Sequence, residues 1–213
     1  MNCRAMSPVV HAGFRPAHRL RPLLAALCAA ALTALGACSG ASPEPPLAGA
    51  AIGGDFTLID KQGKTVRAAD FAGRYRVVYF GYTFCPDVCP LDVQHLMQGV
   101  HAFAKAQPAL GAKLAPMFIT IDPARDTPQV VGEFAANFGP ELIGLTGTPA
   151  QVAAVAKSYA VFYQKGKETA PGAYLMDHSR AAFLMGPEGQ PIAILPAEAD
   201  GKAVAAELEK WVH

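Results

Sequence analysis

The chain has 213 residues, 52% of them hydrophobic, and its 18 basic and 17 acidic residues give a formal net charge of +1. A balance this even, with no basic patch, gives no reason to expect a nucleic-acid-binding protein. After the N-terminal segments described next, roughly 160 residues remain, which is enough for one domain with a proper core and no need of cross-links.

The first 37 residues predict a lipoprotein signal peptide. Four arginines and no acidic residue precede an apolar stretch from Leu23 to Leu35. Such a start is typical of a secretory signal, and the stretch is too short to span a membrane comfortably. Residues 35–38, Leu-Gly-Ala-Cys, resemble a bacterial lipobox, which implies lipidation of Cys38 and cleavage before it. An uncleaved anchor, or an ordinary signal with an incidental cysteine, is the alternative. Either way, we expect the domain to face the periplasm or an equivalent space.

Residues 38–51 are rich in Pro, Ala and Gly without a periodic pattern, so they predict a tether, and a single folded domain is expected over 52–213. Three of the five cysteines belong to the leader and the predicted lipidation site: Cys3, Cys28 and Cys38. The domain therefore holds one pair, Cys85 and Cys89, in a compartment that permits disulfides.

Strands and helices alternate along the domain. A hairpin of Asp55–Ile59 and Lys64–Arg67 comes first. The apolar run Arg76–Tyr82 is typical of a strand covered on both faces. Further strands are expected over 114–121, 142–145, 160–164, 181–185 and 192–195, and helices from 86 or 89 to 106, from 128 to 138, and over 149–158 and 203–212. We therefore expect an α/β protein with a mixed central sheet, helices on both faces and an extra N-terminal hairpin, which is a thioredoxin-like arrangement.

Cys85 and Cys89 lie where a buried strand gives way to a helix, in the sequence Gly-Tyr-Thr-Phe-Cys-Pro-Asp-Val-Cys-Pro of residues 81–90. Helical residues i and i+4 have Cβ atoms about 5–6 Å apart. This spacing suits two thiolates on one metal ion better than a disulfide, which needs Cβ atoms ~3.8 Å apart. Asp87 lies between the thiols and attracts a cation, so it is a candidate neighbour of the metal. Buried structural thiols, or a permanent disulfide, are the alternative.

His178 is the expected third ligand. On the cysteine-bearing helix, His95 and His101 face away from the thiols. His178 precedes the strand 181–185, and in a thioredoxin-like fold this segment abuts the start of the cysteine-bearing helix. Two thiolates and an imidazole suit Cu(I), and they also tolerate Cu(II) and Zn(II). A structural zinc site would need a fourth protein ligand, and the sequence offers no evident one.

Three blocks resemble the Sco/SenC family: residues 81–90, residues 121–128 (Ile-Asp-Pro-Ala-Arg-Asp-Thr-Pro) and residues 177–179 (Asp-His-Ser). The resemblance implies a thioredoxin-like fold and copper, as Cu(I) or Cu(II), held by Cys85, Cys89 and His178. It also implies a role in assembling the dinuclear copper centre of cytochrome c oxidase, by metal delivery, by reduction of the target's cysteines, or by both.

The partner implied by the resemblance is the copper-receiving subunit of the oxidase or another copper chaperone, and Cys38 would anchor the protein at the periplasmic face of the cell membrane. In the second block we expect Asp122 and Arg125 to form a structural ion pair and Thr127 to cap a helix.

Two other functions stay open. One is a partner-specific thiol–disulfide oxidoreductase, in which Cys85 and Cys89 are the redox pair and His178 only tunes the thiols. The other is a peroxidase of the peroxiredoxin type, in which Thr83 and Arg125 would assist a peroxidatic cysteine. A metallochaperone without enzymatic turnover is the favoured reading. The Gly- and Pro-containing loop 165–173 predicts a motion that carries His178 toward or away from the thiols.

Overall fold

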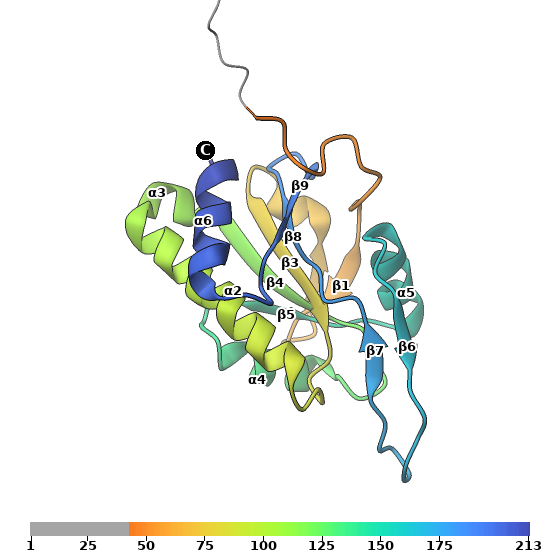
Figure 1. The fold of residues 1–213 in the computed structure, drawn as a ribbon. Coiled ribbons are helices and arrows are strands. Elements are labelled where there is room, and N and C mark those ends of the chain that lie inside the picture. Colours follow the sequence, from red (N-terminus) through yellow and green to blue (C-terminus); the bar gives the residue numbers. More distant parts are fainter. Residues whose placement is uncertain (1–42) are drawn as a thin grey trace, which may run out of the picture. The chain divides into compact units, whose positions relative to one another are not determined.

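The computed structural model describes residues 43–213 (Figure 1). The predicted signal peptide 1–37 and the predicted lipidation site Cys38 lie outside the described residues. The backbone N–H of Leu47 donates a hydrogen bond to the carbonyl of Ile192 at 3.0 Å, so contacts with the domain begin before residue 52. None of the helices within residues 43–213 has the length and apolarity needed to cross a bilayer.

A five-stranded mixed sheet forms the centre of the domain, in the order β5-β4-β3-β8-β9. The central strand β3 (Tyr75–Gly81) runs parallel to β4 (Leu114–Thr120) and antiparallel to β8 (Ala182–Met185). The edges are β5 (Ile143–Leu145) and β9 (Pro191–Leu195). Every residue of β3 and β4 is buried, as expected for apolar runs without polar alternation. The predicted mixed central sheet is confirmed.

Two short ribbons lie outside this sheet. The expected N-terminal hairpin consists of β1 (Thr57–Ile59) and β2 (Thr65–Arg67). The second ribbon pairs β6 (Tyr163–Lys165) with β7 (Met176–His178), antiparallel. The sequence placed a strand over 160–164 in the central sheet and did not predict β7. Both strands of this ribbon are three residues long and have no buried residue, so no hydrophobic alternation marks them.

Helices cover both faces of the central sheet, as predicted. Figure 1 shows α2 (Val88–Ala106) and α6 (Gly201–Trp211) side by side on one face and α5 (Pro149–Ser158) on the other. Two helices were not predicted, η1 (Ala68–Phe71) and α3 (Pro108–Gly111). Pro108 was expected only to end α2, but it also begins α3, because the first helical position needs no backbone N–H donor.

The remaining helix, α4 (Pro128–Ala136), packs against β4 and β5. Thr127 caps it as expected, since its side chain accepts a hydrogen bond from the N–H of Val130. The close packing of α2 against α6 depends on Gly99, because a Cβ atom at that position would lie 2.4 Å from Cγ1 of Val204. Tight packing of α2 on the fold holds its N-terminal end in place beside β3.

Candidate metal centre

The two cysteines lie at the start of α2, but only one of them belongs to the helix. Cys85 precedes the first helical residue, Val88, whereas Cys89 lies in the first turn. This agrees with the predicted helix start at 86 or 89, but the Cβ separation expected for helical residues i and i+4 does not apply to this pair. The N-cap residue Asp87 makes no side-chain hydrogen bond to the helix end. Instead, the backbone N–H of Cys89 donates to Sγ of Cys85 at 3.4 Å, which satisfies one of the free donors of a helix start.

His178 contacts the second cysteine directly. Its Nε2 lies 3.2 Å from Sγ of Cys89. Its Nδ1 lies 2.8 Å from the carbonyl oxygen of Ser179. Because a carbonyl can only accept, Nδ1 carries the proton and Nε2 keeps its lone pair on the side of the sulfur. The rings of Tyr79 and Tyr82 meet the imidazole edge-on, with centroids 6.5 and 6.0 Å away. The tautomer and orientation of His178 are therefore those of a metal ligand.

The three predicted ligands lie together without forming a closed coordination shell. Within residues 43–213, no three His, Cys, Asp or Glu side chains are arranged so that they could hold a metal ion as they stand. Cys85 and Cys89 are free thiols, the first half-buried and the second buried. Asp87, the secondary candidate, has an exposed side chain. The assignment of these residues to a metal stays a prediction.

The other histidines of α2 have partners elsewhere. Nδ1 of His95 lies 2.9 Å from the carbonyl oxygen of Ala197. Nε2 of His101 contacts the carboxylate of Glu141 at the surface. Both contacts agree with the prediction that these two side chains face away from the thiols.

The surroundings of the two thiols push their pKa values in opposite directions. Burial acts to raise the pKa of Cys85, but hydrogen bonds from the N–H groups of Cys89 and Asp87, from the Cys89 thiol and from Tyr82 outweigh burial and lower it below its ordinary value. Burial raises the pKa of Cys89 far above its ordinary range. Burial also lowers the pKa of His178, so its imidazole is neutral at pH 7. Cys85 is thus the thiol that ionises first.

An ion pair between buried Asp92 and Arg180, whose side chain is 43% exposed, connects the segment of His178 to the cysteine-bearing helix, and sequence reasoning missed it. Asp92 of α2 is fully buried. Arg180, two residues after His178, donates to it from Nε at 2.9 Å and from Nη2 at 2.6 Å, and the Tyr79 hydroxyl donates at 2.9 Å. An acidic residue on the buried face that also carries Cys89 was the signal that could have revealed this pair.

A second buried carboxylate holds the turn that leads into Cys85. Asp126, after β4, accepts hydrogen bonds from the N–H of Thr83 at 3.0 Å and from the hydroxyls of Thr83 and Thr120 at 2.6 and 2.5 Å. Burial raises the pKa of Asp126 despite these bonds. Sequence reasoning passed over this residue, although it lies in the second family-like block. Its role is to tie the end of β4 to the thiol-bearing turn.

Arg125 is held by contacts with Asp122, Tyr174 and the Phe84 ring, whose centroid lies 4.8 Å from the guanidinium carbon. The predicted ion pair with Asp122 is confirmed, with Nε 2.6 Å from Oδ2. Nη1 donates to the carbonyl of Tyr174 at 2.8 Å, and the guanidinium carbon lies 3.6 Å from the centroid of the Tyr174 ring. Since the Thr83 hydroxyl is bonded to Asp126, the two side chains that a peroxidase would use at Cys85 both serve other contacts. The geometry of these residues therefore does not support the hypothesis of a peroxidase.

Apolar side chains surround the site at the surface. Phe84, Phe162 and Leu175 are 51%, 60% and 57% exposed. Phe84 directly precedes Cys85, Leu175 directly precedes β7, and Phe162 exchanges backbone and side-chain hydrogen bonds with Ser179. Phe84 and Leu175 line one cavity, and exposed apolar groups that lie together are typical of a surface that receives a protein partner.

Comparisons with known proteins agree with this arrangement. A family model described as SCO1/SenC matches residues 44–213. A mitochondrial SCO2 homolog from Bos taurus is 43% identical over 141 residues, which cover 66% of this chain and 52% of that protein. A mitochondrial SCO1 homolog 1 from Arabidopsis thaliana is 45% identical over 146 residues, covering 68% and 42%. The chain thus spans about half the length of these relatives. The protein SenC of Rhodobacter capsulatus is 44% identical over 141 residues, covering 66% and 62%.

Solved structures give the same family. A crystal structure of Arabidopsis thaliana ScoI with copper bound has a TM-score of 0.68 and 37% identity, and covers 75% of this chain and 96% of that chain. Bradyrhizobium japonicum ScoI with copper bound has a TM-score of 0.68 and 35% identity, covering 76% and 99%. The thioredoxin domain of a Bacteroides vulgatus oxidoreductase, 19% identical with a TM-score of 0.53, shares the fold. On the family model and these relatives together, the chain belongs to the SCO1/SenC family.

Proposed function

We propose that the protein binds copper through Cys85, Cys89 and His178 and delivers it to the dinuclear copper centre of cytochrome c oxidase. The contact that carries this proposal is the 3.2 Å approach of His178 Nε2 to Cys89 Sγ. It supplies an unprotonated nitrogen beside two free thiols, the soft donor set that suits Cu(I) and tolerates Cu(II). Arabidopsis thaliana and Bradyrhizobium japonicum ScoI have been solved with copper bound, which supports the choice of metal.

Copper is the cargo in this proposal, and the chain's own residues govern how it is exchanged. Cys85 has the lower pKa and the more accessible sulfur, so it is the first ligand to meet an incoming ion and the first that a partner's cysteine can displace. His178 is neutral at pH 7, so it needs no proton loss to bind. The apolar rim of Phe84, Phe162 and Leu175 provides the surface for a receiving protein.

We further propose that residues 1–37 are a signal peptide, that Cys38 is lipidated at the periplasmic face of the membrane, and that residues 38–51 link this anchor to the domain of 52–213. The leader and the lipobox-like residues 35–38 support this proposal. Mass spectrometry of the protein from its native membrane tests it, since a chain beginning with an acylated Cys38 is expected. An unmodified Cys38 would contradict the anchor.

A copper titration against a competing Cu(I) chelator tests the metal site. The reduced full chain is expected to bind one equivalent, and Cys85→Ser, Cys89→Ser and His178→Ala are each expected to lose at least about tenfold in affinity, since each removes one of only three donors. The control is His101→Ala, because His101 is an exposed histidine of α2 paired with Glu141. If His178→Ala binds copper as tightly as His101→Ala, the three-ligand site is wrong.

A second function is partner-specific reduction of a disulfide, and the unequal thiols favour it. Cys85 is half-buried with a lowered pKa, as an attacking thiol should be, and Cys89 is a buried thiol whose N–H already contacts the Cys85 sulfur. In this case Cys85→Ser abolishes reduction of the target's cysteines, whereas His178→Ala only slows it. Equal loss in both variants would instead indicate that the reaction depends on the metal.

A further inference from the structure

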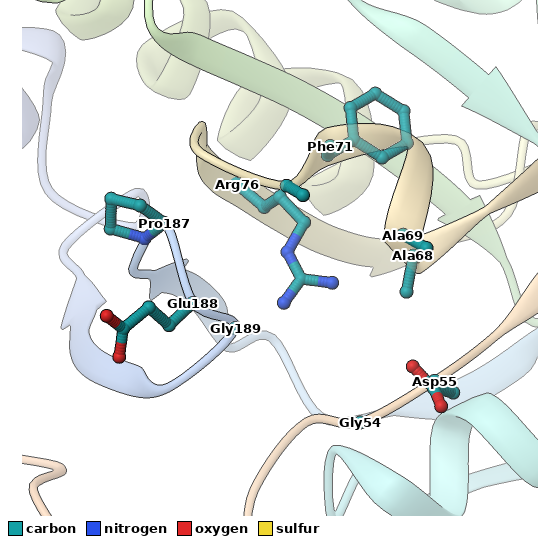
Figure 2. Close-up of a pocket in the computed structure, with 10 residues that line it drawn as sticks. Gly54, Asp55, Ala68, Ala69, Phe71, Arg76, Pro187, Glu188 and Gly189 are labelled. Atoms are coloured by element: carbon teal, nitrogen blue, oxygen red, sulfur yellow. The ribbon is translucent and has the colours of Figure 1, made fainter.

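A cavity of about 230 Å³ lies at the end of β3 away from the thiols. It is bordered by the β2–η1 segment, by the turn between β8 and β9 and by the residues before β1 (Figure 2). Arg76 is the second residue of β3, and Gly81 ends the strand on the side of Cys85. At ~3.3 Å per residue, the two residues are roughly 17 Å apart. The cavity is therefore separate from the candidate metal centre.

Arg76 points its guanidinium into this cavity (Figure 2). The residue is only 5% exposed, and no hydrogen bond or ion pair joins its side chain to a partner among the described residues 43–213. Its nitrogens are not among the fully buried atoms that lack a partner, so solvent reaches them from the cavity. Tyr159, whose hydroxyl lies within reach of the Arg76 charge, does not serve as a partner, because that buried hydroxyl is itself without one. Buried arginines are normally paired, since a guanidinium carries five donors and a charge that is costly to bury alone.

The local backbone leaves the guanidinium accessible from the cavity. Gly189, in the β8–β9 turn, has φ +88, and a Cβ atom there would lie 2.7 Å from Nη2 of Arg76. A side chain at position 189 would therefore clash with the Arg76 guanidinium. Glycine avoids this clash and leaves the guanidinium accessible to a ligand.

We propose that this cavity binds the carboxylate of a small monoanionic ligand on Arg76. The planar fork of arginine matches a carboxylate in a bidentate manner. Asp55 and Glu188 also line the cavity without pairing with Arg76, and their negative charge repels a dianion such as phosphate more strongly than a monoanion. The volume is below the ~300 Å³ typical of small-molecule sites, so the ligand is a short organic acid or the C-terminal carboxylate of a peptide.

Amide chemical shifts of the reduced, metal-free full chain, labelled with ¹⁵N, test this inference with propionate as the probe. We expect saturable shifts at the amides of Gly54, Ala69 and Gly189, which line the cavity. Propionamide has the same shape but no charge and is expected to cause no saturable shift. Because this comparison uses the unaltered chain, it does not depend on the folding of any variant. Absence of saturation with propionate, or equal binding of propionamide, overturns the proposal.

Variants then identify the anchoring residue. Arg76→Gln is expected to weaken propionate binding by about tenfold or more, since it removes a charge-assisted hydrogen-bond pair. Arg67→Gln is the matched control, because Arg67 is an exposed arginine on β2, and its affinity should not change. Equal affinities of the two variants would overturn the assignment to Arg76.

Two further probes identify the source of the carboxylate. Inorganic phosphate is expected to bind more weakly than propionate, and tighter binding of phosphate would overturn the preference for a monoanion. The peptide acetyl-Gly-Ala is tested with a free and with an amidated C-terminus. If the free form binds more tightly than propionate and the amidated form does not bind, the natural ligand is the C-terminus of a peptide. If propionate binds more tightly than acetyl-Gly-Ala, the natural ligand is a short organic acid. Arg76→Gln should leave the copper titration unchanged, so this inference and the proposed copper site can fail independently.

Discussion

Arg180 and Asp92 connect the two parts of the candidate metal centre, although 88 residues separate them in the sequence. Two hydrogen bonds, of 2.9 and 2.6 Å, run from Nε and Nη2 of Arg180 to the two carboxylate oxygens of Asp92. Asp92 follows Cys89 by about one turn of α2, and Arg180 follows His178 by two residues. The pair therefore determines where the imidazole lies relative to the sulfur.

Replacing Arg180 by Gln should weaken both the fold and the site. The carboxylate of Asp92 is fully buried, and it would keep only the Tyr79 hydroxyl as a partner. Because the Arg180 side chain is 43% exposed, water can replace part of the lost pairing. We therefore expect a loss of about 2 kcal/mol in urea unfolding and a weaker site in the copper titration. Lys210→Gln is the control, since its pair with Glu207 is at the surface and is worth less than ~1 kcal/mol. Equal losses of stability in both variants would show that the Asp92–Arg180 pair does not connect the two parts of the site.

Replacing Asp126 by Asn should loosen the turn before Cys85. The amide keeps the size of the carboxylate but offers one acceptor oxygen in place of two, where three donors from Thr83 and Thr120 now converge. We expect a loss of about 2 kcal/mol in unfolding free energy and increased motion of Thr83–Cys85 in NMR relaxation. The control is Asp60→Asn in the β1–β2 turn, where the carboxylate accepts only backbone N–H groups near the surface. A control loss as large as that of Asp126→Asn would argue against this role.

Alkylation of the reduced chain should distinguish the two thiols. The lowered pKa of Cys85 makes it a thiolate at lower pH than an ordinary cysteine, whereas burial keeps Cys89 protonated. With iodoacetamide, we expect Cys85 to be modified first, and its rate to be half-maximal at a lower pH than that of an ordinary thiol. Peptide mapping gives the alkylation rate at each cysteine. In urea, where the chain is unfolded, the two rates should become equal. Faster modification of Cys89 in the folded chain would contradict the pKa order.

Stability should fall in mildly acidic solution because of His178. Burial lowers its pKa below the ordinary value of 6.5. The unfolded chain therefore binds a proton at a higher pH than the folded chain does. The stability contribution is present above pH 6.5 and is lost as the pH falls through the lower folded pKa.

Urea unfolding across this range, with the ring titration followed by NMR, measures the effect of His178. In His178→Gln the unfolding free energy should fall less as the pH is lowered below 6.5. In His101→Gln, where an exposed histidine is replaced, the unfolding free energy should fall as much as in the unaltered chain. An NMR pKa of His178 above 6.5 would reverse the sign of the expected effect.

Phe84→Ser should separate copper transfer from copper binding. Phe84 is 51% exposed beside Cys85 and carries no donor atom, so copper affinity should be unchanged. Loss of an apolar anchor at a protein interface costs about 1–2 kcal/mol, which predicts transfer to the dinuclear copper domain of the oxidase about tenfold slower. Ile194→Ser is the matched control, because Ile194 is 50% exposed on the edge strand β9. Equal transfer rates for both variants would remove Phe84 from the docking surface.

The sequence allowed the central elements and the three proposed ligands to be predicted, because each has a local signal. The buried strand β3 is a continuous apolar run, and the thiols follow it directly. His178 could be inferred because the other histidines of the domain are few. The residues that position these side chains could not be inferred, since Asp92 pairs with Arg180 across 88 residues and nothing in either local sequence specifies the other.

The pattern of hydrophobic residues also could not predict the short strands. The ribbon β6–β7 has three residues in each strand and no buried residue in either, so its place outside the central sheet had no hydrophobic signature. The predicted geometry of the cysteine pair was wrong for a different reason. The predicted helix start, at 86 or 89, already left Cys85 before the helix, which begins at Val88, so the helical i, i+4 spacing should not have been applied to the pair.

Because β7 is bonded to β6 and not to the central sheet, the β6–β7 ribbon can bend and move His178 away from Cys89 without breaking a hydrogen bond of the five-stranded sheet. If His178 is a copper ligand, as proposed, this movement would vacate one coordination position while Arg180 stays paired with Asp92. Release of the ion would then require no unfolding of the domain, so one molecule could serve successive rounds of transfer.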